Sequence, residues 1–127
     1  MKILGVDYGR SKVGLAIGEG NLAEPLKVIR YQDPGSLCGQ IKKIVEEEKF
    51  EKVVVGISEG KIGEEIEKFT KKLEKELSVP VETFDETLTS KDAQTFSIEA
   101  GIKRSKRKRM EDAYAASIML QNYLDSR

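Results

Sequence analysis

Apolar residues in the first part of the chain fall into short runs that predict β-strands. The run Ile3–Val6 ends at Asp7, and the segment Lys12–Ile17 resumes the apolar pattern after the turn-forming stretch Tyr8–Ser11. Two such runs joined by a short turn are typical of a β-hairpin. The sequence therefore predicts an antiparallel pair of strands with Asp7 at its mouth.

A third strand is predicted over Pro25–Tyr31. Proline cannot donate a hydrogen bond to a neighbouring strand, so this strand is expected at an edge of the sheet. The residues expected on one side of it are Leu26, Val28 and Arg30.

After the turn signal Asp33-Pro34-Gly35, the spacing of apolar residues changes to the period of a helix. The apolar face of this first helix contains Leu37, Ile41, Ile44 and Val45. The later elements, in chain order, are a strand over Lys52–Ile57, a helix over about Ile62–Leu77, a strand over Val79–Asp85, a helix opened by the capping sequence Thr89–Asp92 and ended by Gly101, and a last helix over Met110–Leu124.

The order of these elements is β-β-β-α-β-α-β-α-α. Three successive strands followed by alternating helices and strands predict a five-stranded mixed sheet, antiparallel at first and parallel later, with helices on both faces. A chain of 127 residues has room for one such α/β domain and not for two ordinary ones. We therefore expect residues 1–127 to form a single domain with one functional site.

The charge of the chain is unevenly distributed, although its formal net charge is zero. Six cations lie within the seven residues 103–109, and the rest of the chain therefore carries a net charge of 0 − 6 = −6. Such asymmetry favours a polyanionic partner. The cations are Lys103, Arg104, Lys106, Arg107, Lys108 and Arg109.

The content of thiols and imidazoles limits the possible chemistry. Cys38 is the single cysteine and the chain has no histidine, so a disulfide is excluded and a zinc site has almost no ligands. No stretch reaches the roughly 20 apolar residues of a membrane span, and charges interrupt the N-terminal apolar run. These features favour a cytoplasmic protein without membrane partners.

Three carboxylates occupy positions where the predicted sheet would bring them together. Asp7 ends the first strand, Glu86 follows the strand Val79–Asp85, and Asp112 lies in the first turn of the predicted last helix. Ligands of open α/β sheets collect at the carboxyl ends of strands. Clustered carboxylates repel one another unless cations neutralise them, and oxygen ligands favour Mg²⁺ or Mn²⁺. We therefore expect a metal site, with two ions as in many phosphodiesterases.

A purely structural explanation must be weighed against this one. With 22 acidic residues in the chain, Glu86 and Asp112 could stand near element ends by chance, and Asp112 could simply favour a helix N-terminus. Asp7 is harder to explain in this way, because a charge next to an apolar strand is costly to bury without a partner.

Cations and glycine near Asp7 could bind phosphate. Gly9 permits positive φ and a close approach of backbone to an anion, and Arg10 and Lys12 could reach phosphate oxygens. A tight hairpin with solvated cations is an equally good explanation of these residues. Tyr8 is the one aromatic residue expected close enough to stack on a base, whereas Phe69 is expected in the core.

The six cations of residues 103–109 are expected in a loop just before Asp112, at the rim of the metal site. A basic rim beside an acidic centre suits a nucleic-acid backbone, with contacts that position the substrate without reading its sequence. The structural alternative is an ordinary solvated charge run.

Together these segments resemble the YqgF/RuvX family of pre-16S ribosomal RNA nucleases, also described as Holliday-junction-resolvase-like. The similarity spans nearly the whole chain, with the motifs in the family's order and spacing. The segments that carry it are Ile3–Gly9, Lys12–Ala16, Asp85–Ser90, Lys106–Lys108 and Asp112–Ala116.

The resemblance implies an RNase H-like fold and a bacterial cytoplasmic protein that trims the 5′ end of precursor 16S ribosomal RNA. The family's metal-binding carboxylates would fall on Asp7, Glu86 and Asp112, and Lys12 stands where the family has a basic residue. Two departures concern the substrate. Thr87 replaces the arginine that usually follows the Asp-Glu pair, and residues 56–63 differ from the family's Gly-Leu-Pro loop.

Other functions remain open at this point. A DNA resolvase acting on four-way junctions would need paired active sites and hence a dimer, although the expected state is a monomer or weak homodimer. A non-catalytic RNA-binding protein could have kept the same fold. An actin-like ATPase shares the Asp-x-Gly hairpin but needs two such domains around its nucleotide.

Overall fold

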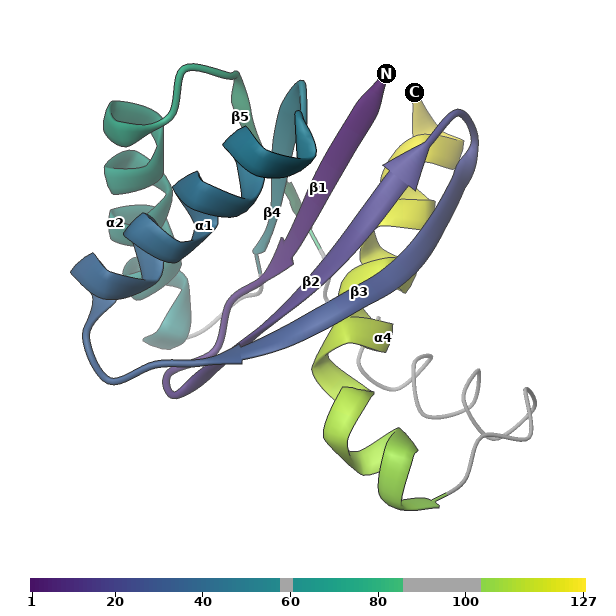
Figure 1. The fold of residues 1–127 in the computed structure, drawn as a ribbon, viewed down its shortest axis with the longest axis horizontal. Coiled ribbons are helices and arrows are strands. Elements are labelled where there is room, and N and C mark those ends of the chain that lie inside the picture. Colours follow the sequence, from purple (N-terminus) through teal and green to yellow (C-terminus); the bar gives the residue numbers. More distant parts are fainter. Residues whose placement is uncertain (58–60, 86–103) are drawn as a thin grey trace.

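The computed structural model describes residues 1–57, 61–85 and 104–127, and within them five strands form one mixed sheet (Figure 1). The order across the sheet is β3-β2-β1-β4-β5; β1, β2 and β3 pair antiparallel, whereas β4 pairs parallel with both β1 and β5. This confirms the predicted sheet. The strands are β1 (Lys2–Asp7), β2 (Lys12–Glu19), β3 (Leu22–Arg30), β4 (Lys52–Ile57) and β5 (Val81–Asp85).

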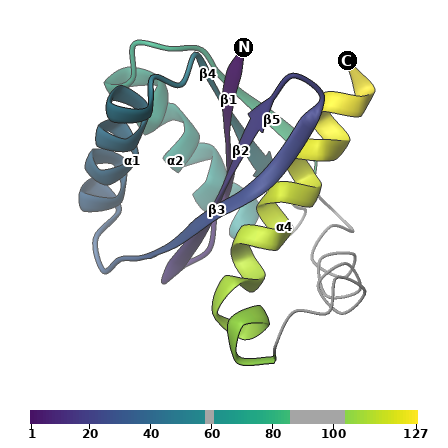
Figure 2. The same ribbon diagram turned by 45° about the vertical axis from the view of Figure 1, so that its right-hand side comes forward.

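Helices cover both faces of the sheet, as expected. Helices α1 (Pro34–Glu48) and α2 (Lys61–Glu76) pack on one face, and α4 (Arg104–Ser126) packs on the other (Figures 1 and 2). Strand alternation explains the two layers, because successive side chains point to opposite faces. In β1, Leu4 and Val6 join the core below α1 and α2, whereas Ile3 joins the core below α4.

The apolar face predicted for α1 is confirmed, and α2 and α4 each bury an apolar face as well. They pack as follows: Leu37, Ile41 and Val45 of α1 and Ile66, Phe69 and Leu73 of α2 are buried on one side of the sheet, and Ala113, Ala116, Ser117, Leu120 and Leu124 of α4 on the other.

Helix α1 begins two residues earlier than Ser36. Asp33 is its N-cap: the backbone N–H of Ser36 donates to the Asp33 carboxylate at 3.0 Å, and Pro34 is the first helical residue. Proline suits this position because the first N–H groups of a helix have no partner within it. The stretch read as a turn is therefore a helix start.

Strand β3 is longer than predicted, and its faces differ from simple alternation. It begins at Leu22 after a two-residue turn in which Gly20 has φ 64°, a conformation that glycine adopts readily. Ala16 pairs with Pro25 and Leu15 with Lys27, so Leu26 forms a bulge. The bulge lets Leu26 and the buried Ile29 pack on the α1 side. The expectation that Leu26 shares a side with Val28 and Arg30 is therefore wrong, although the edge position is confirmed.

Helix α4 also begins earlier than predicted, at Arg104 instead of Met110. Lysine, arginine and methionine are strong helix formers, and neighbouring like charges oppose a helix by only a few tenths of a kcal/mol per pair. The expectation that residues 104–109 form a loop is therefore wrong. Lys103 and the helix predicted between Thr89 and Gly101 lie outside the described residues.

The first turns of α4 extend past the end of the sheet at which β1 terminates (Figures 1 and 2). At 23 residues this helix has the length of a membrane span, but its first part is highly charged. Throughout the described parts of the chain, no helix combines the length and the apolar character needed to cross a bilayer.

Candidate functional site

Asp7 is the last residue of β1, the central strand, and it lies between two glycines of the neighbouring strands. It pairs with Gly14 of β2 and with Gly56 of β4. Ile3 packs below α4, and a side chain added at Gly5 would meet Leu120 of α4 at 3.1 Å. By strand alternation the Asp7 side chain belongs to the same face, toward α4. The lack of a side chain at Gly14 lets helix α4 come close to the strand beside Asp7.

Helix α4 brings Asp112 to the same end of the sheet. The backbone of Asp112 packs directly on Gly14, where an added Cβ would lie only 1.9 Å from the Asp112 carbonyl oxygen. Since Gly14 is the cross-strand partner of Asp7, the two carboxylate residues are neighbours across one glycine. The structure thus brings together two of the three predicted metal ligands, each of them partly buried.

Asp112 was predicted in the first turn of its helix. It lies about two turns further on, because α4 starts at Arg104. The effect of a helix dipole on a carboxylate fades beyond the first turn. Stabilisation of a helix N-terminus therefore no longer explains Asp112, and its position over Asp7 needs another reason.

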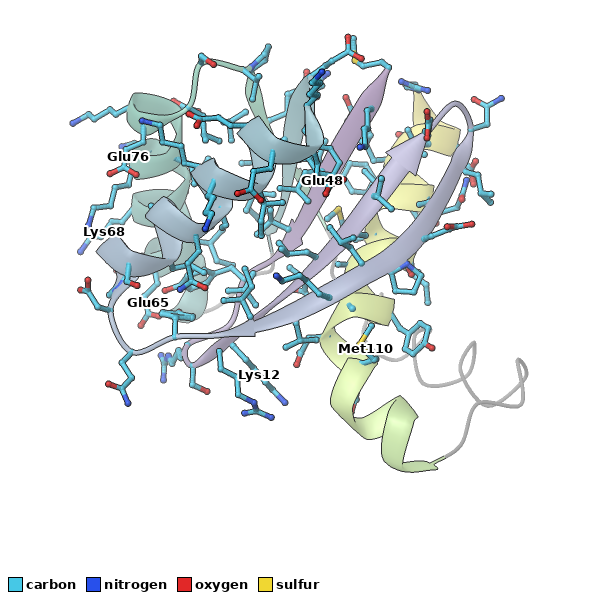
Figure 3. All side chains as sticks on the ribbon, viewed as in Figure 1. Lys12, Glu48, Glu65, Lys68, Glu76 and Met110 are labelled. Atoms are coloured by element: carbon cyan, nitrogen blue, oxygen red, sulfur yellow. The ribbon has the colours of Figure 1, made fainter. Side chains whose placement is uncertain are left out.

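Lys12 joins this group of residues from the start of β2. Its Nζ lies 3.2 Å from Oδ2 of Asp112, with 41% of the lysine side chain and 30% of the aspartate side chain exposed. Figure 3 shows Lys12 at the end of the β1–β2 hairpin, on the side toward Met110 of α4. An ion pair this exposed adds about 1 kcal/mol or less to stability, so both charges stay available to a ligand.

The third predicted carboxylate, Glu86, lies outside the described residues. Among the residues that the structure does describe, no three acidic, histidine or cysteine side chains are grouped closely enough to hold a metal ion. Strand β5 supplies one relevant observation: Phe84 packs on the α4 side, with its ring centroid 5.8 Å from that of Tyr123. Glu86 has the same sequence parity as Phe84, whereas Asp85 has the opposite one.

Gly9 is required for a reason other than the one predicted. Gly20 is the one glycine of positive φ among those described, so Gly9 does not use its freedom to adopt that conformation. A Cβ at Gly9 would instead lie 2.5 Å from the Lys12 carbonyl oxygen across the hairpin turn. The Tyr31 hydroxyl donates to the Gly9 carbonyl oxygen and ties the turn to the residue after β3.

Arg10 points away from the two carboxylates and toward α2. Its Nε lies 3.3 Å from Oε1 of Glu65, and together with Tyr8 and Tyr31 it lines a pocket of about 410 Å³ on the α1 and α2 side. Arg10 is thus separated from Asp112 by the sheet. The sequence interpretation missed the α2 residues of this pocket, although their spacing of three to four residues was a usable signal.

The cations of residues 104–109 lie on the helical turns of α4 that precede Asp112. Cations at a helix N-terminus oppose its dipole. This segment precedes Asp112 in the same helix, and its role as a phosphate-binding rim stays a prediction.

Comparison with known proteins agrees with the sequence motifs. The family model RuvX, described as Holliday junction resolvase, matches residues 1–126. A protein of Natranaerobius thermophilus named "Putative pre-16S rRNA nuclease" is 36% identical over 98% of this chain and 94% of its own length. A protein of Chloroflexus aggregans with the same name is 40% identical over the same shares of the two chains.

Solved structures with a similar fold include two Holliday junction resolvases. The fowlpox virus resolvase superposes with a TM-score of 0.68 at 13% identity, covering all of both chains. Thermus thermophilus RuvC in complex with a Holliday junction has a TM-score of 0.62 at 17% identity, covering 100% of this chain and 95% of its own. These likenesses establish the RNase H-like fold. The family match and the relatives together show that the chain belongs to the RuvX family.

Proposed function

We propose that this chain is a divalent-metal-dependent nuclease that hydrolyses a phosphodiester bond near the 5′ end of precursor 16S ribosomal RNA. Nuclease activity is supported by the family match and by the names of the curated relatives. The observation that carries the proposal is the contact of Asp112 with Gly14, which puts Asp7 and Asp112 at one end of the sheet. We propose that the whole chain forms this one domain and works in the cytoplasm.

The donor set fits a hard divalent cation. Asp7 and Asp112 offer carboxylate oxygens and the chain contains no histidine, a combination that favours Mg²⁺ or Mn²⁺. We propose Glu86 as the third ligand, because its parity matches that of Phe84 on the α4 side, and we propose two ions. Bound there, such ions would activate the attacking water and neutralise charge on the leaving oxygen.

The neighbouring cations would hold and orient the RNA. Lys12 lies beside Asp112 and at the turn next to Asp7, so its ammonium group can bind a phosphate oxygen at the point of cleavage. The positive residues at the start of α4 would bind phosphates further along the strand, without reading bases. Lys12 therefore positions the reacting phosphate, whereas Lys103 to Arg109 contribute affinity.

Substitution of the carboxylates tests this assignment. We expect Asp112→Asn and Asp7→Asn to lower the rate of cleavage of labelled precursor RNA by more than about 100-fold, since loss of a residue that only supports a metal ligand costs 10–100-fold. Binding of the RNA should persist. Asp125→Asn is the matched control on α4, because Asp125 is exposed near the C-terminus and its oxygen accepts from Gln121, which asparagine can also do. Wild-type cleavage by Asp112→Asn would contradict the proposal.

Four-way DNA is the alternative substrate, favoured by the description of the family model and not by the site. A resolvase would need a dimer, whereas the large apolar side chains exposed in the described parts of the chain are Met1 and Leu22. We therefore propose a monomer or weak homodimer acting on RNA. Cleavage of a labelled four-way junction faster than precursor RNA, with dimers in sedimentation, would favour the DNA reading.

A non-catalytic RNA-binding protein would behave differently toward metal. A ligand that binds the folded state at 100 times its Kd stabilises it by about 2.7 kcal/mol. We expect Mg²⁺ or Mn²⁺ to raise the melting temperature of the wild type and much less that of Asp7→Asn. Equal melting temperatures with and without metal would favour the non-catalytic alternative.

A further inference from the structure

The α1 and α2 side of the sheet carries a pocket that the nuclease site does not use. It has a volume of about 410 Å³, within the roughly 300–1,000 Å³ of ligand sites, and lies at the turn that follows β1. Its wall begins at Tyr8, the residue directly after Asp7. The pocket and the proposed site are thus on opposite sides of one hairpin. Asp7 belongs to the site and Tyr8 to the pocket, and the Cα atoms of two such consecutive residues are about 3.8 Å apart.

Three aromatic rings line this pocket. The ring centroid of Tyr8 lies 4.8 Å from that of Phe69 and 6.3 Å from that of Tyr31, and both pairs are tilted. Phe69 is fixed in the core, whereas Tyr8 and Tyr31 are partly exposed. An aromatic surface that is partly exposed can stack with any nucleobase, because every base has a π-face.

The rim of the pocket is positively charged. Arg10, Lys68 and Lys72 line it, and Glu65 is the one acidic residue of the lining, which gives a net charge of 3 − 1 = +2. Figure 3 shows Glu65 and Lys68 on α2, on the other side of the sheet from α4. Opposite charges attract, so this rim suits an anionic ligand.

The two lysines of the rim are neighbours on the surface of α2. Lys68 and Lys72 are one helical turn apart, a spacing at which like charges destabilise a helix, and neither forms an ion pair with another residue of the described parts of the chain. Arg10 pairs with Glu65, but their side chains are 65% and 42% exposed, so a phosphate can compete with this pair. An anion between the two lysines would relieve their repulsion.

We propose that this pocket binds an unpaired nucleotide of a single-stranded RNA, with the base on Tyr8 and Tyr31 and the phosphate between Lys68 and Lys72. The inference rests on the proposed function, because it assumes that the strand continues from the Asp7 site around the hairpin turn. It adds a requirement for unpaired RNA beside the cleaved bond.

Charge reversal on α2 tests the phosphate half of the pocket. We measure binding of a short labelled single-stranded RNA by fluorescence anisotropy in the absence of divalent metal, so that cleavage plays no part. Lys68→Glu with Lys72→Glu should weaken binding at least about tenfold and lower the slope of log Kd against log salt by roughly 0.7 per lost phosphate contact. Lys71→Glu with Lys75→Glu is the matched control: the charge change, helix and spacing are the same, and neither lysine lines the pocket.

Removal of bases tests the aromatic half. Stacking of one base on an aromatic side chain corresponds to a change in affinity of about 5- to 150-fold. The wild type should therefore bind the RNA more tightly than an abasic strand of the same length, and Tyr8→Leu should bind the two almost equally. Melting temperatures of all variants confirm that they are folded.

Three results would overturn the inference. The first is equal weakening by the two charge-reversed pairs, the second is equal affinity of the wild type for the normal and abasic strands, and the third is binding of free adenosine monophosphate as tight as that of the strand. Each of them can occur while Asp7→Asn still abolishes cleavage, so failure of this pocket is distinguishable from failure of the nuclease assignment.

Discussion

Gly14 is the position where one added methyl group should disturb both the fold and the site. In Gly14→Ala the new Cβ would lie 1.9 Å from the carbonyl oxygen of Asp112, 2.2 Å from its carbonyl carbon and 2.8 Å from the nitrogen of Ala113. All three are backbone atoms of α4, so no flexible side chain can move out of the way. Ordinary contact begins at 3.4 Å, and the helix or strand must therefore shift by about 3.4 − 1.9 = 1.5 Å.

The expected cost follows from this displacement. Overpacking of a well-packed interior destabilises a protein by about 1–3 kcal/mol, occasionally more. For a chain of 127 residues the entropy of unfolding is roughly 0.27 kcal/mol/K, so the melting temperature should fall by about 4–11 °C. A misplacement of about 1 Å can cost 100-fold in rate, and the shift separates Asp112 from Asp7. We therefore expect cleavage to drop at least about 100-fold in protein that is still folded.

Gly39→Ala is the control for this substitution. Gly39 lies inside α1, and an added Cβ there has nothing within 4 Å. Alanine is about 0.8–1 kcal/mol better than glycine in a helix interior, so this variant should melt slightly higher than the wild type and keep its activity. Thermal melting by circular dichroism and a cleavage assay below the melting point decide the matter. Wild-type stability and cleavage in Gly14→Ala would refute the tight contact between β2 and α4.

Two further predictions concern charged groups. Lys52 Nζ lies 2.8 Å from Oε1 of Glu82, and the Tyr123 hydroxyl is hydrogen-bonded to both side chains. The pKa of Lys52 is raised, mainly by its hydrogen bond with Glu82 and next by the one with Tyr123. The pKa of Glu82 is lowered, mainly by Lys52 and next by Tyr123. Glu82 contributes to the free energy of unfolding above its unfolded pKa of about 4.3, and this contribution is lost as the pH falls through its lower folded pKa. The contribution of Lys52 is complete below its unfolded pKa of about 10.4 and is lost as the pH rises through its higher folded pKa. Lys52→Met should therefore lower the melting temperature at neutral pH, by no more than about 4 °C because the pair is partly exposed. The difference from the wild type should vanish in acid. A difference that stays constant across the whole pH range would contradict this prediction. Separately, replacing Lys106 and Arg107 of α4 by alanine should reduce the salt slope of RNA binding by about 0.7 per lost phosphate contact without changing base preference, and an unchanged slope would show that these residues do not contact phosphate.

Local patterns in the sequence contain most of the information about the elements. Apolar runs and alternation predict each strand, and helical spacing predicts which face of α1 is buried, because apolar residues recur along the chain with the period of the element that buries them. The same reasoning identifies Asp7, since a charge at the end of an apolar strand stands out without any knowledge of distant residues. Residues 104–109 were expected in a loop but begin helix α4, in agreement with the strong helix propensity of lysine and arginine.

Contacts between distant segments were decided by the tertiary structure alone. The bulge at Leu26 depends on how β3 pairs with β2, and a shift of one residue exchanges the faces of a strand. The contact of Asp112 with Gly14 depends on how closely α4 packs on the sheet, which is set by the shapes of both surfaces. The sequence by itself thus determined which residues are unusual, Asp7 above all. Only the packing of α4 decided that Asp112 meets Lys12 at the end of β1, and only the packing of α2 decided that Arg10 pairs with Glu65 on the other side. Steric fit between remote segments has no local signature in the sequence.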